Sequence, residues 1–187
     1  MKQNIKKGIS YIAFGFLFTL VNINLTISGT EINIMPDCVG WILFFLAIDE
    51  LGEYSAGKTY LKWISLVLAI FTGAFWILGI MMPETDLSVF RSAVNLVSAF
   101  CIFMILGIVE MIAMDYGSRR AGTIGFLRWF SMIIFLALSV LGLLALRVIP
   151  IEPASIIVAV LGAAAIIAAI ITLFTLFGLR REINESF

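Results

Sequence analysis

The chain has 187 residues, of which 62% are hydrophobic and 13% are charged, and its 12 basic and 12 acidic residues leave no net charge. A soluble domain of this size could not bury so much apolar surface, so the composition excludes a soluble protein and predicts an integral membrane protein. The sequence contains no histidine, which removes the commonest general base near neutral pH and the commonest metal ligand. We therefore expect no enzyme activity, no metal and no cofactor.

Six apolar segments are candidate membrane spans. A spanning helix needs about 17 to 25 mostly apolar residues, and the candidates are residues 9–25, 36–51, 60–82, 90–114, 125–149 and 154–179. The connections between them are too short to hold a soluble domain. The sequence therefore predicts a single all-α, multi-pass domain over residues 1–187, with six transmembrane helices.

The first span leads into a polar stretch, VNINLTISGTEINIMPDCVGW, from Val21 to Trp41. Polar and apolar residues alternate on both sides of Gly29, and a period of two is typical of strands. We therefore expect a short extended or β-hairpin element between the first two helices. A first helix that continues to Ser28 and a re-entrant loop are the alternatives. Pro36 and Asp37 predict the start of the second helix.

Two runs in this stretch, NINL and INIMPDCVGW, resemble a motif of small multi-pass membrane proteins of Gram-positive bacteria. The motif reads N-I-N-L and I-N-I-x-P-D-x-x-G-[WY], and this chain has Cys38 where the group usually has an aromatic residue. The resemblance implies a bacterial cell membrane. It implies no particular activity and no functional residues.

Polar residues at the outer ends of the spans form a candidate pocket. They are Asn22, Asn24, Asp37 and Asn95. Amide side chains in an apolar setting need partners, because an unpaired buried polar group costs about 1 to 3 kcal/mol. These residues either satisfy one another and the extended element, or line an outward-facing pocket for a small solute in which Asp37 is the only charge.

The segment GEYSAGKT, from Gly52 to Thr59, matches the phosphate-binding pattern GxxxxGK[ST] at every required position. That loop works only when it leaves a β-strand and opens a helix, so that its amides surround the phosphates. Here it follows an apolar span. We therefore predict that it binds no nucleotide.

Acidic residues gather near the inner ends of the second and fourth spans. They are Asp49, Glu50, Glu53, Glu110 and Asp115. An ionisable residue within a span is a functional candidate by default, so one interpretation is a cation or proton site. The other is structural ion pairing with the nearby bases Lys58, Lys62, Arg119, Arg120 and Arg128.

The first, third and fifth spans begin alike, with KGIS at 7–10, KWIS at 62–65 and RWFS at 128–131. One interpretation is a threefold repeat of helical hairpins, similar to the parallel repeats of some transporters. The other is anchoring at the membrane interface, where Trp, Lys and Arg are enriched.

The sixth span carries small residues on one helical face, namely Gly162, Ala165, Ala169 and Thr172. Small residues let a neighbouring backbone approach closely. The face either packs within the bundle or contacts a membrane protein partner or a second copy of the chain.

The distribution of basic residues predicts the orientation. With a cytoplasmic N-terminus, ten bases lie inside: Lys2, Lys6, Lys7, Lys58, Lys62, Arg119, Arg120, Arg128, Arg180 and Arg181. Only Arg91 and Arg147 lie outside. Because cytoplasmic loops are enriched in Lys and Arg, we expect a cell-membrane protein with both termini in the cytoplasm.

The leading functional hypothesis is a small-solute binding or transport component. In size, span number and orientation the chain resembles the substrate-binding subunit of energy-coupling-factor vitamin transporters. It has Leu17 four residues after Ala13, where that family has a second alanine. The alternative is an accessory or immunity-type protein that packs against a larger membrane partner. Neither hypothesis involves nucleic acid or nucleotide, and the lipid bilayer is the expected surrounding.

Overall fold

The computed structural model describes residues 2–20, 24–27, 30–33, 36–55, 57–82, 88–145 and 151–185. Within these residues the chain forms six α-helices, two short strands and one 3-10 helix. In chain order they are α1 (Lys2–Leu20), β1 (Asn24–Ile27), β2 (Thr30–Asn33), α2 (Asp37–Glu50), η1 (Gly52–Ser55), α3 (Thr59–Met81), α4 (Ser88–Asp115), α5 (Ala121–Ala145) and α6 (Ile151–Glu185).

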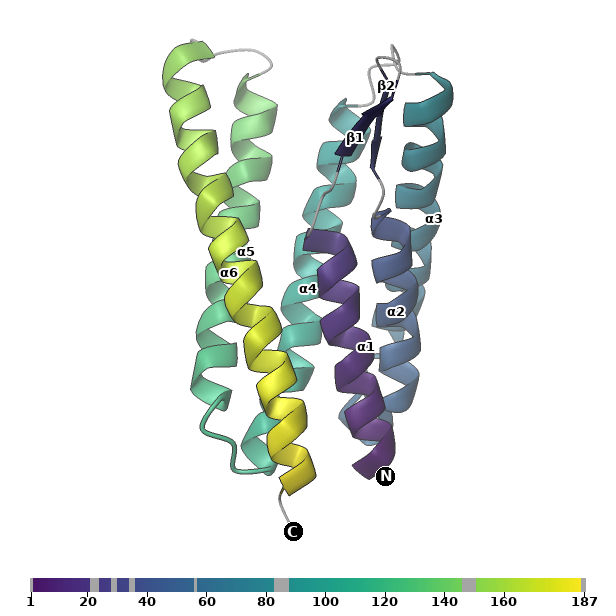
Figure 1. The fold of residues 1–187 in the computed structure, drawn as a ribbon, viewed down its shortest axis with the longest axis vertical. Coiled ribbons are helices and arrows are strands. Elements are labelled where there is room, and N and C mark those ends of the chain that lie inside the picture. The colour runs from purple at the N-terminus through teal and green to yellow at the C-terminus, as the bar shows by residue number, and fades with distance from the viewer. Residues whose placement is uncertain are drawn as a thin grey trace.

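The helices run up and down the bundle and close into a ring. Each helix packs against the next one in the chain, and α6 packs against α1. Figure 1 shows the N- and C-termini at one end of the bundle, which we call the termini end, and β1 and β2 at the opposite end, which we call the strand end. The six helices therefore alternate in direction.

Four of the described helices, α3 to α6, are long and apolar enough to cross a membrane. Large apolar side chains such as Ile70, Ile133, Val160 and Phe174 point away from the bundle and are more than half exposed. In water this exposed apolar surface would be unfavourable, whereas lipid solvates it. The protein is therefore membrane-embedded.

The core lies where α1, α2 and α4 meet. On α1 the fully buried side chains are Ile5, Ile9, Ile12 and Phe16, whose spacing of three or four residues places them on one helical face. On α4 they include Ile105, Ile108 and Ile112, with the same periodicity, and also Cys101, Leu106, Val109 and Ala113. Of the four long helices, α4 buries the largest share of its length. The sequence thus positions α4 inside the bundle and leaves α3, α5 and α6 facing outward.

The helices differ from the expected spans most at α1 and α6. The first span was expected at 9–25, but α1 runs from Lys2 to Leu20. A continuous helix to Ser28 is contradicted, because β1 begins at Asn24. At the other end of the chain, α6 continues past the expected end at Leu179 to Glu185. Lys, Arg and Glu are good helix formers, so these two helices extend through their charged ends beyond the apolar segments.

The two strands occupy the alternating segment between α1 and α2. They pair antiparallel, with Asn24 opposite Asn33 and Ile27 opposite Thr30. Residues 28 and 29, where the sequence predicts a turn, lie outside the described residues, as does Asn22. In Figure 1 the strands continue the short helices α1 and α2 toward the strand end, and β2 packs against α3.

The second helix begins at Asp37, as the sequence predicts, and Pro36 occupies the position before it. The amide of Val39 donates a hydrogen bond of 3.0 Å to the Pro36 carbonyl oxygen, which forms the first turn. With 14 residues, α2 spans about 21 Å. Its N-terminus therefore lies well below the strand end of the bundle, and Asp37 lies among the neighbouring helices.

Candidate functional site

A cavity of about 360 Å³ lies in the half of the bundle toward the strand end. We call it the polar pocket. Five helices, α1 to α5, supply its walls, and it is lined by Thr19, Asp37, Trp41, Thr72, Ser92, Asn95, Ser98, Ala99, Ile102, Phe135, Leu138 and Ser139. Seven of these twelve residues are polar, although the helices that carry them are predominantly apolar. Six of the seven polar side chains are half-buried between the helices, whereas Asn95 lies at an exposed position on α4.

Among the residues that the structure describes, Asp37 is the only charged one that lines the polar pocket. Its side chain is half-buried, and the Oδ1 atom is buried without a hydrogen bond from any described residue. A buried polar atom without a partner costs about 1 to 3 kcal/mol. An atom of this kind on a cavity wall is a natural attachment point for a hydrogen-bond donor that enters the cavity.

Three hydroxyls in the polar pocket have their protons engaged by the backbone. Thr19, Thr72 and Ser139 each donate to the carbonyl oxygen four residues earlier, over 3.1, 2.7 and 2.8 Å respectively. A hydroxyl has one proton to donate but two lone pairs that can accept. These side chains can therefore present acceptors to the cavity without losing their helical hydrogen bonds.

A row of polar residues on α4 forms one wall of the polar pocket. Ser92, Asn95 and Ser98 are spaced by three residues, so they lie along one face of the helix. The Asn95 amide carries both donors and an acceptor. This wall can therefore both donate hydrogen bonds to a solute and accept hydrogen bonds from it.

Aromatic side chains of α1 and α2 pack against one another beside the polar pocket. Trp41, which is 2% exposed, contacts Phe44 edge-on with ring centroids 5.2 Å apart, and Phe44 contacts Phe16 of α1 in the same way at 5.3 Å. Edge-to-face pairs of this kind are favourable because the positive edge of one ring meets the negative face of the other. The pocket is therefore closed by packed aromatic rings at Trp41.

The structure brings two of the four candidate pocket residues together. Asp37 and Asn95 line the same cavity. Asn24 begins β1, and Asn22 lies outside the described residues. The sequence analysis missed the five hydroxyl residues of the pocket. The three-residue spacing of Ser92, Asn95 and Ser98 is the signal that could have revealed part of them.

The acidic candidates at the termini end are mostly engaged in ion pairs. Asp49 accepts a hydrogen bond of 2.7 Å from Lys62, Glu110 accepts one of 3.0 Å from Arg128, and Glu50 pairs with Lys7. The Glu50 carboxylate, first through its hydrogen bond and then through its charge, raises the pKa of Lys7 above its usual value. Each pair links the end of an even-numbered helix to the start of an odd-numbered one.

The same three bases, Lys7, Lys62 and Arg128, begin the similar segments KGIS, KWIS and RWFS. In the structure each of these bases forms an ion pair with an acidic residue of α2 or α4. Trp63 and Trp129, which follow two of them, are about 60% exposed. This arrangement favours anchoring at a membrane interface.

The remaining two acids lie apart from these pairs. Glu53 is exposed on η1, and Asp115 lies beside Tyr54, whose pKa is raised by burial and then by the Asp115 carboxylate. Among the described residues, no three His, Cys, Asp or Glu side chains are arranged to hold a metal ion. The geometry favours structural ion pairing over a shared cation site.

The GEYSAGKT segment adopts a shape unlike a phosphate-binding loop. Gly52–Ser55 forms the 3-10 helix η1 directly after α2. Gly52 and Gly57 have φ values of +51° and +75°, which glycine adopts readily. The chain enters this segment from a helix and not from a strand, so the backbone lacks the strand-to-helix turn that phosphate binding requires.

The small-residue face of α6 is partly internal. Ala165, Ala169 and Thr172 line a small gap of about 10 Å³ together with side chains of α1 and α5. Gly162 differs, because a Cβ placed on it would meet no atom within 4 Å. The face therefore packs within the bundle over most of its length.

No protein-family model matches the chain, and neither a curated protein nor a solved structure is significantly similar to it. The resemblance of NINL and INIMPDCVGW to proteins of Gram-positive bacteria stays a prediction.

Proposed function

We propose that the protein is a six-span component of a bacterial cell membrane, with both termini in the cytoplasm and the paired strands as a protected outer hairpin. The support comes from charge and geometry together. The bases of α1, the bases of α6 and the ion-paired Lys62 and Arg128 belong to the termini end, and cytoplasmic segments are enriched in such residues.

Helices α1 and α2 complete the six spans in this proposal. Beyond its basic start, α1 covers about 20 Å from Gly8 to Leu20, and α2 covers about 21 Å, so both fall short of the roughly 30 Å apolar layer. A four-residue strand adds about 13 Å to each. The pairing of β1 with β2 satisfies backbone groups that lipid could not, so a short helix followed by a paired strand can cross.

We propose further that the polar pocket binds a small solute from the outer side of the membrane, as a solute-binding or transport component. The observation that carries this proposal is the buried Oδ1 atom of Asp37, which receives no hydrogen bond from the described residues and lies on the wall of a cavity of about 360 Å³. An ionisable side chain placed inside a membrane bundle is costly and is commonly functional. The volume lies within the range of about 300 to 1,000 Å³ that is usual for ligand pockets.

The chemistry of the lining indicates the solute. A carboxylate and three hydroxyls whose protons are already donated to the backbone present acceptors, so the pocket complements a molecule rich in donors. A positive charge beside Asp37 would form a charge-assisted hydrogen bond, which is stronger than a neutral one. The proposed solute is a small organic ammonium compound, with Asn95 contacting its neutral polar part.

Thermal stability tests this proposal. The full chain in mild detergent is heated with small ammonium compounds, with neutral polar solutes of equal size, and with carboxylates. Ammonium compounds should raise the unfolding temperature, because a ligand that binds only the folded state stabilises it. The increase should vanish in Asp37→Asn and persist in Asp49→Asn, whose carboxylate lies at the termini end.

The alternative is the accessory or immunity-type protein, and the same preparation distinguishes it. A stoichiometric membrane partner that co-purifies with the chain, together with no stabilisation by any solute, would support that alternative and contradict a solute-binding role. Gly162 and the outer half of α6 are the part of the small-residue face open to such a partner.

A further inference from the structure

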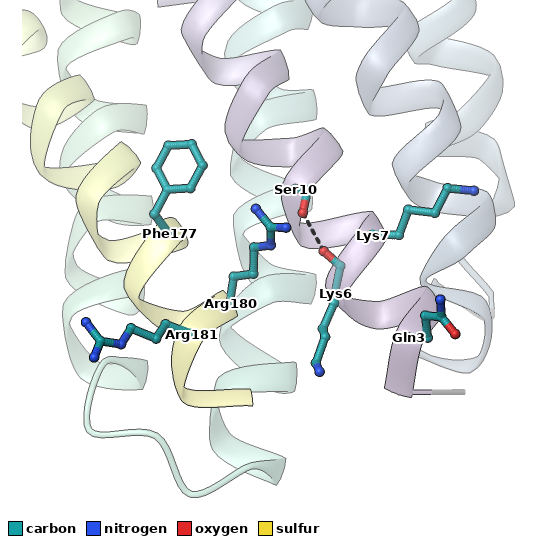
Figure 2. A pocket seen from close by; sticks show the side chains of 7 residues that line it. All are labelled: Gln3, Lys6, Lys7, Ser10, Phe177, Arg180 and Arg181. Carbon is teal, nitrogen blue, oxygen red and sulfur yellow. Dashed lines mark hydrogen bonds between the residues drawn. The ribbon is translucent and has the colours of Figure 1, made fainter. Parts of the chain in front are cut away.

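A second cavity, of about 660 Å³, lies between α1 and α6 at the termini end. We call it the basic pocket. Its lining residues are Gln3, Lys6, Lys7 and Ser10 of α1 and Phe177, Arg180 and Arg181 of α6 (Figure 2). Four of these seven are basic and none is acidic. A cavity lined in this way attracts an anion.

The basic side chains that line the basic pocket point in different directions. In Figure 2 Arg180 extends from α6 toward α1 and ends near Ser10, while Lys6 points toward the termini end. Lys7 turns the other way, toward α2, where it pairs with Glu50. Within the described part of the chain, Arg180 forms no ion pair. Arg180 therefore supplies the charge between α1 and α6, and Lys6 supplies a second charge nearer the termini end.

Two uncharged polar residues of α1 also line the basic pocket. Gln3 is exposed, and in Figure 2 its amide lies on the side of α1 away from Arg180. The Ser10 hydroxyl donates to the Lys6 carbonyl oxygen over 2.7 Å, which ties the two residues together on one turn of α1. The Arg180 guanidinium and the Lys6 ammonium are donors of the kind that the oxygens of a phosphate group accept from, and a guanidinium binds phosphate in a bidentate manner.

Apolar surface borders the basic pocket on the membrane side. Phe177 lines the cavity and contacts Phe14 of α1 edge-on, with ring centroids 5.8 Å apart. Both rings are about 40% exposed, and Phe174, one turn before Phe177, is 73% exposed. A groove with basic charges at its end and exposed aromatic rings beside it is amphipathic in the same sense as a phospholipid.

We propose that the basic pocket binds the phosphate headgroup of an anionic phospholipid, with an acyl chain lying against Phe14 and Phe177. This site is distinct from the polar pocket, which lies toward the other end of the bundle, and it does not depend on which solute the polar pocket binds. A free phosphate would satisfy the charges but would leave the aromatic surface unused, so the lipid is the better match.

Native mass spectrometry of the detergent-solubilised full chain tests the proposal, with phosphatidylglycerol compared against phosphatidylcholine. The wild type should bind phosphatidylglycerol more tightly. Lys6→Gln combined with Arg180→Gln should weaken that binding by at least about fivefold, because each base near a membrane surface contributes about 1 kcal/mol. The matched control, Lys58→Gln combined with Arg119→Gln, removes two charges elsewhere and should change the binding less than about twofold.

Three results would overturn the proposal. Equal losses in both double variants would mean that binding depends only on total charge, and no loss in either would mean that the basic pocket is not the site. Displacement of the lipid by millimolar inorganic phosphate would assign the pocket to a soluble anion. If the double variant does not fold, the binding of phosphatidylglycerol to Arg180→Gln alone is the test. This side chain is exposed, so its replacement should not prevent folding. Solute-dependent stabilisation should persist in these variants, which separates this test from that of the polar pocket.

Discussion

The carbonyl oxygen of Gly15 in α1 lies 2.7 Å from the position that a Cβ on Gly40 of α2 would occupy. A Cβ on Gly15 would in turn lie 2.7 Å from the Phe44 ring. The two helices therefore approach so closely that neither position has room for a side chain. This crossing fixes the separation of Thr19 and Asp37, which follow and precede the two glycines and line the polar pocket.

Gly40→Ala should destabilise the protein. The added Cβ would meet a backbone carbonyl that cannot rotate away, and overpacking of this kind costs about 1 to 3 kcal/mol. The free energy of unfolding, measured by titration with sodium dodecyl sulfate, reports the loss. Gly162→Ala is the control, because its Cβ would meet no atom within 4 Å. Equal stabilities of the two variants would show that α1 and α2 are not in close contact.

The pair of Glu110 and Arg128 should contribute to stability as a structural link between α4 and α5. Both side chains are less than a quarter exposed, and the Arg128 guanidinium lies 4.0 Å from the centre of the Phe103 ring. Glu110→Gln should therefore lower the free energy of unfolding by about 1 to 3 kcal/mol. Glu53→Gln, at an exposed site, should leave it unchanged. If Glu110→Gln is also neutral, the pair is merely a surface contact.

The GEYSAGKT segment should not bind nucleotide. Lys58 lies 3.7 Å from the Met111 sulfur, and no strand presents the loop. Binding of a fluorescent ATP analogue to the full chain should stay at background in the wild type and in Lys58→Ala. Saturable binding in the wild type that disappears in Lys58→Ala would contradict this reading of the segment.

The orientation predicts which segments a membrane-impermeant thiol reagent reaches. In a chain with both native cysteines replaced, Thr85→Cys should react in intact cells, because residues 83–89 are expected outside. Arg119→Cys should react only after the membrane is opened. Labelling of both positions from the same side would contradict the six-span topology.

Much of the helical architecture could be predicted from the sequence, because the apolar segments determine it directly. The start of α2 is an example, since Pro36 and Asp37 favour that position for reasons local to a single turn. The residue at which α1 ends was harder to predict. Apolar β-branched residues near Leu20 fit helix and strand alike, and only the pairing of β1 with β2 decides where the helix stops.

The candidate sites could be predicted only in part. Asp37 and Asn95 stand out because their side chains are rarely tolerated in lipid. Thr19, Thr72 and Ser139 do not stand out, since a hydroxyl can bond its own helix and is common in apolar spans. Which face of each helix turns inward depends on its neighbours in the ring.

The contacts of α1 illustrate the same limit. A side chain at Gly8 or Gly15 is excluded only because α2 crosses α1 there, and the basic pocket exists only because α6 returns to the N-terminal turn of α1. The sequence separation between these helices leaves no local pattern that predicts either contact.

The affinity of the full chain for the ammonium compound that stabilises it best, measured by isothermal titration calorimetry, is the most direct test of the polar pocket. Replacing Asp37 by asparagine preserves the size of the side chain but removes its charge. Because hydrogen bonds to charged groups are worth about 1.5 to 3 kcal/mol, Asp37→Asn should weaken binding by at least about tenfold, while Asp49→Asn should not. Unchanged affinity in Asp37→Asn, or equal losses in both variants, would contradict a solute site at Asp37.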